Sequence, residues 1–389
     1  MAPVTSPVEN LLASREIIVT CGPGGVGKTT TAAALGVLAA SRMGGRVLVL
    51  TVDPARRLAD ALGLKGIGNE VTDVPASVFA DAGVPMVGSL SAAMLDTKKS
   101  WDDLIARHAP DDETRDRILA NPLYQSLSGR FIQSHDYIAM ERLYELHATR
   151  EWDLIVVDTP PTRNALDFLD APARMADFFS SRLLRWLIAP ARSGIVNFAS
   201  KPFTQIADRI LGTEFLGDIA EFFISMQSMY GGFVERANAV ARLMADDRTS
   251  FLVVSSSEAV PLREAEFFAE QLSARDLDLG AVILNKVLPA MLTDPAAAEA
   301  ASRLEERSTA IAERLSSTLT LDQPSVARVL ATVAESFTDF SVVAHREAAA
   351  RDRLPTQGAP LLEVPRMEGD VADLSGLFSI GKALLDPSL

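Results

Sequence analysis

Short apolar runs alternate with longer, mixed stretches along this chain. Each run has apolar residues at consecutive positions, and glycine, proline or serine residues lie close to its ends. This pattern is typical of strands that are covered on both faces by helices. The runs are Ile17–Cys21, Val47–Val52, Leu154–Asp158, Phe251–Ser255, Ala281–Asn285 and Leu361–Val364. We therefore predict an α/β fold with a doubly wound, mostly parallel sheet.

The predicted strands are unevenly spaced. Roughly a hundred residues precede the third strand, and again the fourth, whereas a simple crossover needs only about a dozen. The long intervals indicate insertions, and their composition favours helices. We expect helical insertions at about residues 100–150, 172–247 and 289–352, all within a single domain of residues 1–389.

Composition narrows the class of protein. The chain has 389 residues, of which 48% are apolar, and it contains one cysteine, Cys21. A single cysteine excludes an intrachain disulfide and a zinc site with two thiolates from one chain, and it fits a reducing compartment. We find no apolar run long enough to span a membrane and no signal-peptide pattern, so we expect a cytoplasmic protein. The formal net charge of −14 argues against a nucleic-acid partner.

A glycine-rich segment separates the first predicted strand from a helical stretch. Its residues G-P-G-G-V-G-K-T, from Gly22 to Thr29, fit the pattern G-x-x-x-x-G-K-[ST] in the strand and helix context that this pattern requires. Glycines let successive N–H groups point at an anion beside the positive end of a helix. We expect Lys28 to bind the β- and γ-phosphates of ATP and Thr29 to bind Mg²⁺. The expected ATP contacts here are Gly22, Gly24, Gly25, Val26, Gly27, Lys28, Thr29 and Thr30.

Two aspartates follow predicted strands. Asp53 lies in Asp53-Pro-Ala after the second strand, and Asp158 lies in Asp158-Thr-Pro-Pro-Thr at the end of the third. Either residue alone could be a helix cap. Beside a phosphate loop, one fits the positioning of water and the other the binding of Mg²⁺ from the carboxyl edge of the sheet.

These motifs together resemble the ArsA family of ATPases, within the wider group of MinD- and ParA-like dimeric ATPases. The likeness is greatest to actinobacterial ArsA-like anion-transporting ATPases. The resemblance implies that Asp53 positions the attacking water and also lies at the metal, and that Asp158 holds Mg²⁺ through water. It also implies that Asn285 reads adenine and that the loop containing Pro365 and Arg366 folds over the base. The alternative for Asn285 is a cap at the end of its strand.

The chain departs from the family pattern at Pro23. The family has a lysine there that reaches the partner subunit's phosphates, and proline cannot do this. Arg56 or Arg57 could replace it, a partner with an intact lysine could complete the site, or hydrolysis could be slow. The chain also lacks the cysteines with which family members bind metalloids, and it has Arg163-Asn164 in place of the family's glycine-histidine.

The resemblance implies a dimeric switch ATPase that acts on a hydrophobic client or a membrane protein. Many apolar residues between Phe178 and Phe233 fit either helix packing or a client groove. Pro23 favours a heterodimer with a homologous ATPase over a homodimer. The alternative is a nucleotide-binding regulatory or chaperone-like subunit that needs a paralogue with the lysine. A kinase or synthetase would need a substrate pocket that the sequence does not reveal.

Overall fold

The computed structural model describes residues 6–52, 56–128, 132–159, 170–171, 173–174, 177, 221–316, 322–367, 369–371 and 373–385, without the side chains of residues 56–57, 126–128 and 132–135. In these ranges the chain forms an eight-stranded sheet in the order β3-β4-β2-β5-β1-β6-β7-β8. The strands are β1 (Ile17–Cys21), β2 (Arg46–Thr51), β3 (Thr72–Asp73), β4 (Ser89–Met94), β5 (Leu154–Asp158), β6 (Thr249–Ser256), β7 (Leu279–Val287) and β8 (Leu361–Pro365). Neighbouring strands are parallel except β3 and β4. The predicted doubly wound, mostly parallel α/β sheet is confirmed.

Two strands, β3 and β4, were missing from the prediction. Both lie in the long interval between the predicted second and third strands. β4 has the sequence Ser-Leu-Ser-Ala-Ala-Met, without a β-branched residue, and β3 contains only two residues. Such segments lack the local preference that identifies a strand. Pairing with β2 makes β4 a strand, because its central residues are buried there.

Helices cover both faces of the sheet. Successive residues of β1 contribute to different cores: Ile18 belongs to one, and Ile17 and Val19 belong to the other. The first core receives side chains from α1 (Pro7–Ser14), α2 (Lys28–Arg42), α3 (Arg56–Ala61), α4 (Ala76–Asp81) and α18 (Leu374–Leu385). Within it, α2 packs so closely on β2 that a Cβ at Gly36 would collide with Val49. The phosphate loop is therefore fixed between a buried strand and a buried helix.

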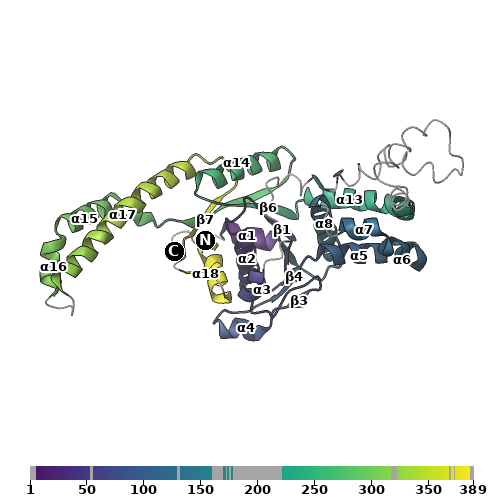
Figure 1. Cartoon of the computed structure of the whole chain (residues 1–389), viewed down its shortest axis with the longest axis horizontal. Coiled ribbons are helices and arrows are strands. Elements are labelled where there is room, and N and C mark those ends of the chain that lie inside the picture. Colours follow the sequence, from purple (N-terminus) through teal and green to yellow (C-terminus); the bar gives the residue numbers. More distant parts are fainter. Residues whose placement is uncertain are drawn as a thin grey trace, which may run out of the picture.

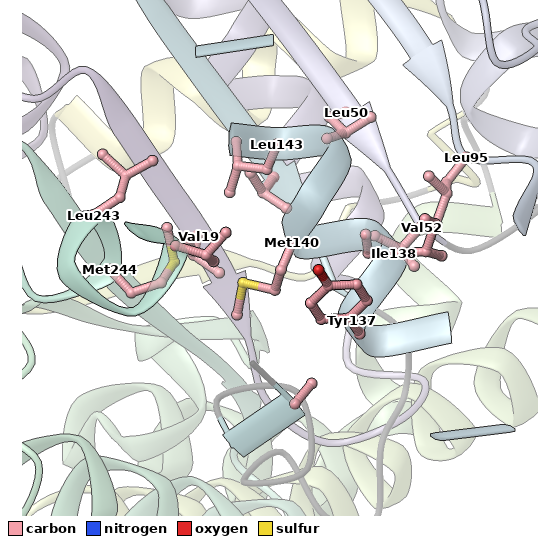
Figure 2. Packing of buried hydrophobic residues seen from close by; sticks show 14 of the residues in the cluster. Val19, Leu50, Val52, Leu95, Tyr137, Ile138, Met140, Leu143, Leu243 and Met244 are labelled. Atoms are coloured by element: carbon pink, nitrogen blue, oxygen red, sulfur yellow. The ribbon is translucent and has the colours of Figure 1, made fainter. Parts of the chain in front are cut away.

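The opposite face packs against a cluster of helices at one end of the molecule (Figure 1). These are α5 (Thr97–His108), α6 (Asp112–Ala120), α7 (Pro122–Ser128), α8 (Ile132–Ala148) and α13 (Tyr230–Met244), with a 3-10 turn, η1 (Gln227–Met229). Figure 2 shows part of this core, with Val19 of β1, Leu50 of β2, Met140 and Leu143 of α8, and Leu243 of α13. Side chains of these helices and of the sheet form one continuous core.

Most of the apolar segment between Phe178 and Phe233 lies outside the described residues, which resume at 221. A client groove there stays a prediction. In the part of the chain that the structure describes, no helix is both long and apolar enough to cross a membrane.

Three helices between β7 and β8 form an arm. They are α15 (Pro295–Glu306), α16 (Ser308–Ser316) and α17 (Gln323–Arg351), preceded by a 3-10 turn, η2 (Ala290–Thr293). α15 and α16 pack along α17, and the arm extends from the sheet at the end opposite to α5 and α6 (Figure 1). The 29-residue α17 returns to the sheet and contacts α14 (Ala259–Ser273). The arm thus has its base beside the carboxyl ends of β6, β7 and β8.

Candidate functional site

The phosphate loop joins β1 to α2 through a backbone that requires glycine. Gly22, Gly25 and Gly27 have φ angles of 137°, 78° and 98°. A Cβ at Gly22 would collide with the carbonyl oxygen of Val254 on β6, and one at Gly27 with the amide of Asn285. Both collisions explain why only glycine fits at these two positions. Gly24 is exposed on the loop, whereas Val26 is buried in the core below it.

Lys28 begins α2, and its side chain is buried and lies across the loop. Its Nζ donates a hydrogen bond to the carbonyl oxygen of Pro23 at 2.8 Å. The ammonium is thus held inside the loop, where the α2 N-terminus adds positive potential. Pro23 itself is buried. Position 23 therefore helps to hold the lysine of its own loop.

Asp158 is the polar centre of the sheet edge. Thr29 Oγ1 donates to Asp158 Oδ2 at 2.6 Å, and Thr51 Oγ1 donates to the same oxygen at 2.9 Å. The register pairs Thr51 with Asp158 across β2 and β5. Hydroxyl and carboxylate oxygens are the hard ligands that Mg²⁺ prefers, and Mg²⁺ is usually held by few protein groups together with phosphates and water. This donor set fits the predicted magnesium site, with Thr29 as the direct ligand and Asp158 behind it.

Asp53 lies outside the described residues, as do Pro54 and Ala55, and the side chains of Arg56 and Arg57 are also not described. The chain leaves β2 at Thr51, whose side chain contacts Asp158. Asp53 follows Thr51 by two positions in the sequence. Its water-positioning role stays a prediction.

A cavity of about 1260 Å³ lies beside the phosphate loop. It exceeds the ~300–1,000 Å³ typical of small-ligand pockets, so it has room for a nucleotide. The predicted site residues that line it are Gly25, Gly27, Lys28, Thr29, Thr30, Asn285, Pro365 and Arg366. They come from the phosphate loop with the start of α2, the end of β7 and the end of β8. The parallel sheet brings these segments to one edge.

Asn285 connects β7 to the phosphate loop. Its Nδ2 donates to the carbonyl oxygen of Val26 at 2.8 Å, and its Oδ1 accepts from the N–H of Lys286 at 2.9 Å. Lys286 adopts φ 65° and donates from Nζ to the carbonyl oxygen of Gly25 at 3.3 Å. These contacts are the ones expected if Asn285 caps the end of its strand, which is the alternative to reading adenine. Because Asn285 also lines the cavity, its reading of adenine stays a prediction.

Asn285→Ala is expected to lower the preference for ATP over GTP by about three- to tenfold, the value of one hydrogen bond. Titration calorimetry with both nucleotides measures the ratio, which does not depend on the folded fraction of each preparation. An unchanged ratio would assign the reading of the base to another residue.

Several residues near the site were not predicted from the sequence. Thr51, which donates a hydrogen bond to Asp158, lies two residues before Asp53, and the cavity-lining Lys286 directly follows Asn285. Nothing local marks Glu258 after β6, or Phe340 and Glu347 on α17. Phe340 and Glu347 reach the cavity only because the arm returns to the sheet, whereas Glu258 lies there because it comes soon after the end of β6.

Cys21 ends β1, fully buried beside the loop. Burial raises the pKa of its thiol to about 12, with an opposing effect from Lys28. Its Sγ donates to the carbonyl oxygen of Leu252 at 3.5 Å. A neutral thiol of this kind acts as a small core residue.

Comparison with known proteins identifies the family. Residues 15–321 match the profile of the ArsA-type family described as anion-transporting ATPase. The chain belongs to this family. Similar proteins include an ATPase ASNA1 homolog from Entamoeba dispar, 26% identical over 291 residues, which are 72% of this chain and 80% of that protein. The ATPase get3 of Schizosaccharomyces pombe is 25% identical over 288 residues, 74% of this chain and 78% of that one.

The match confirms the resemblance that the motifs indicated, and this ArsA-family chain is an ATPase. The matched region contains the phosphate loop, Asp53, Asp158 and Asn285. It ends at residue 321, before α17 and β8. The base of the arm and the loop with Pro365 and Arg366 therefore lie beyond the matched residues.

Proposed function

We propose that this chain is a Mg²⁺-dependent switch ATPase that works as a dimer and couples its nucleotide state to a hydrophobic client or membrane partner. One observation supports the nucleotide chemistry most strongly. Lys28 lies inside a loop that requires glycine at positions 22 and 27, and the neighbouring Thr29 hydroxyl donates to the Asp158 carboxylate at 2.6 Å. Lys28 and Thr29 both line the cavity, which supports phosphate binding by the lysine and metal binding by Thr29 with Asp158 behind it.

In the proposed reaction, water attacks the γ-phosphorus, the bond from that phosphorus to the ADP oxygen breaks, and ADP and phosphate leave. Lys28 neutralises the β- and γ-phosphate oxygens, and Asp53 orients the water. Thr29 would hold Mg²⁺ directly and Asp158 would hold it through water, so that the ion shields phosphate charge. Thr51 keeps the Asp158 carboxylate in place by its hydrogen bond.

The proposed dimer is a heterodimer, because the family lysine at position 23 is replaced by a buried proline. The partner would be a homologous ATPase with that lysine. Pro23 also favours the alternative of a regulatory subunit that binds ATP but needs the paralogue for hydrolysis, whereas the intact Lys28, Thr29, Asp53 and Asp158 favour the ATPase. We propose a cytoplasmic location, because a single cysteine fits a reducing compartment. We assign client binding to the helical insertion of residues 172–247, within the single domain of residues 1–389.

Asp53→Asn tests the hydrolytic role. We expect kcat to fall roughly a hundredfold, the effect of a misplaced reactant, while Mg·ATP still binds because the phosphate loop is intact. Phosphate release measures the rate and calorimetry the affinity. Asp81→Asn makes the same change on the exposed surface of α4 and should leave both unchanged. Wild-type turnover in Asp53→Asn would remove Asp53 from the mechanism.

A further inference from the structure

The arm helix α17 forms part of the cavity wall. Phe340, Val343 and Glu347 all line the cavity, and their spacing of three and four residues places them on one face of the helix. The first two side chains are 50% and 43% exposed, so they present apolar surface to the open cavity. Of these three residues, Glu347 is the charged one.

Glu347 has an unusual environment for a carboxylate. Its Oε2 is buried and has no hydrogen-bond partner among the described residues. Glu258, after β6, and Arg366, after β8, line the same cavity. Burial and the nearby Glu258 raise the pKa of Glu347, and Arg366 opposes this shift. A buried acceptor without a donor is costly, so this position suits a ligand that brings a donor.

The cavity lining contains both signs of charge: Lys28, Lys286 and Arg366 are basic, and Asp60, Glu258, Glu347 and Asp370 are acidic. Lys28 and Thr29, at the phosphate loop, suit the phosphates. Glu258 and Glu347 are acidic, and they would repel a triphosphate, which has acceptors and negative charge. A nucleoside has donors: the ribose hydroxyls and the exocyclic amine of adenine. Carboxylates commonly accept hydrogen bonds from ribose hydroxyls.

We propose that Glu347 is a specificity-determining residue that accepts a hydrogen bond from a donor on the nucleoside half of ATP, either a ribose hydroxyl or the adenine amine. The inference rests on the proposed function, because it requires that this cavity binds ATP. It makes the base of the arm part of the nucleotide site, although α17 lies beyond the residues that match the family.

Binding selectivity tests this role without measuring turnover. Calorimetry in Mg²⁺ buffer compares ATP with 2′-deoxy-ATP, 3′-deoxy-ATP and purine riboside triphosphate, which lacks the amine. We expect the wild-type chain to prefer ATP about tenfold over the analogue without the contacted donor, as for a hydrogen bond to a charged group. Glu347→Ala should reduce that preference to near one. Glu347→Gln keeps an acceptor oxygen and should retain part of it.

Glu335→Gln is the matched control, because Glu335 is exposed on the same helix and does not line the cavity. It should show the wild-type ratios. If the wild-type chain binds ATP and all three ratios are the same in Glu347→Ala, the proposal for Glu347 is wrong while the nucleotide site stands. If the wild-type chain binds no ATP, both fail.

Discussion

The wild-type chain on its own is expected to hydrolyse ATP slowly, and a copy that presents a lysine at position 23 is expected to accelerate it in trans. In GTPases a missing trans cation lowers the rate by roughly three to five orders of magnitude. Pro23 has no charge, and it is buried. Two identical sites would therefore both lack the cation, which is why a heterodimer is the favoured assembly.

Mixing two forms of this chain separates hydrolysis at the wild-type site from the effect of a lysine supplied by the other copy. The donor is Pro23→Lys combined with Asp53→Asn, which should bind ATP without hydrolysing it. Added to the wild-type chain, the donor should raise phosphate release per wild-type site at least about tenfold, a conservative fraction of the GTPase effect. Asp53→Asn with Pro23 unchanged is the control and should have no such effect.

Two outcomes would contradict this account. Fast turnover by the wild-type chain alone would show that no trans lysine is needed. Arg56→Ala and Arg57→Ala then ask whether a neighbouring arginine replaces it, and loss of the fast rate in either would identify that residue. Fast turnover that survives both changes would defeat the heterodimer and the arginine substitute together.

The sequence predicts the central sheet well because buried parallel strands leave consecutive apolar residues. Six strands have this pattern and are predicted from it: β1, β2, β5, β6, β7 and β8. β4 does not, because serine and alanine become strand residues there only through pairing with β2. The 29-residue α17 illustrates the second limit. Its helical composition is visible in the sequence, but its return to the cavity depends on how the arm packs.

The phosphate site is predictable because its chemistry is local. Gly22 to Thr29 are contiguous, so their spacing alone specifies a loop and a helix N-terminus. Thr51 and Glu347 become site residues through contacts over long sequence distances, and no local pattern marks them. Asn285 is intermediate: its position at a strand end is predictable, but its hydrogen bond to Val26 is a tertiary contact.

Lys28→Ala is expected to abolish detectable binding of Mg·ATP. The lysine is buried, and its Nζ is held 2.8 Å from the carbonyl oxygen of Pro23, inside the loop that faces the cavity. Removing it deletes the charge that opposes the β- and γ-phosphates and leaves the backbone N–H groups alone. Two charge-assisted hydrogen bonds are worth at least about a hundredfold in affinity. Lys28 is the one cation within Gly22–Thr29, and the nearby Lys286 donates its Nζ to the carbonyl oxygen of Gly25.

Titration calorimetry of Mg·ATP into the wild-type chain, Lys28→Ala and Lys65→Ala is the most direct test that this cavity is the nucleotide site. Lys65 is an exposed lysine, so Lys65→Ala controls for the loss of one positive charge. We predict saturable binding to the wild-type chain and to Lys65→Ala, and no detectable heat of binding with Lys28→Ala. Equal affinity of Lys28→Ala and the wild-type chain would contradict the nucleotide site described here.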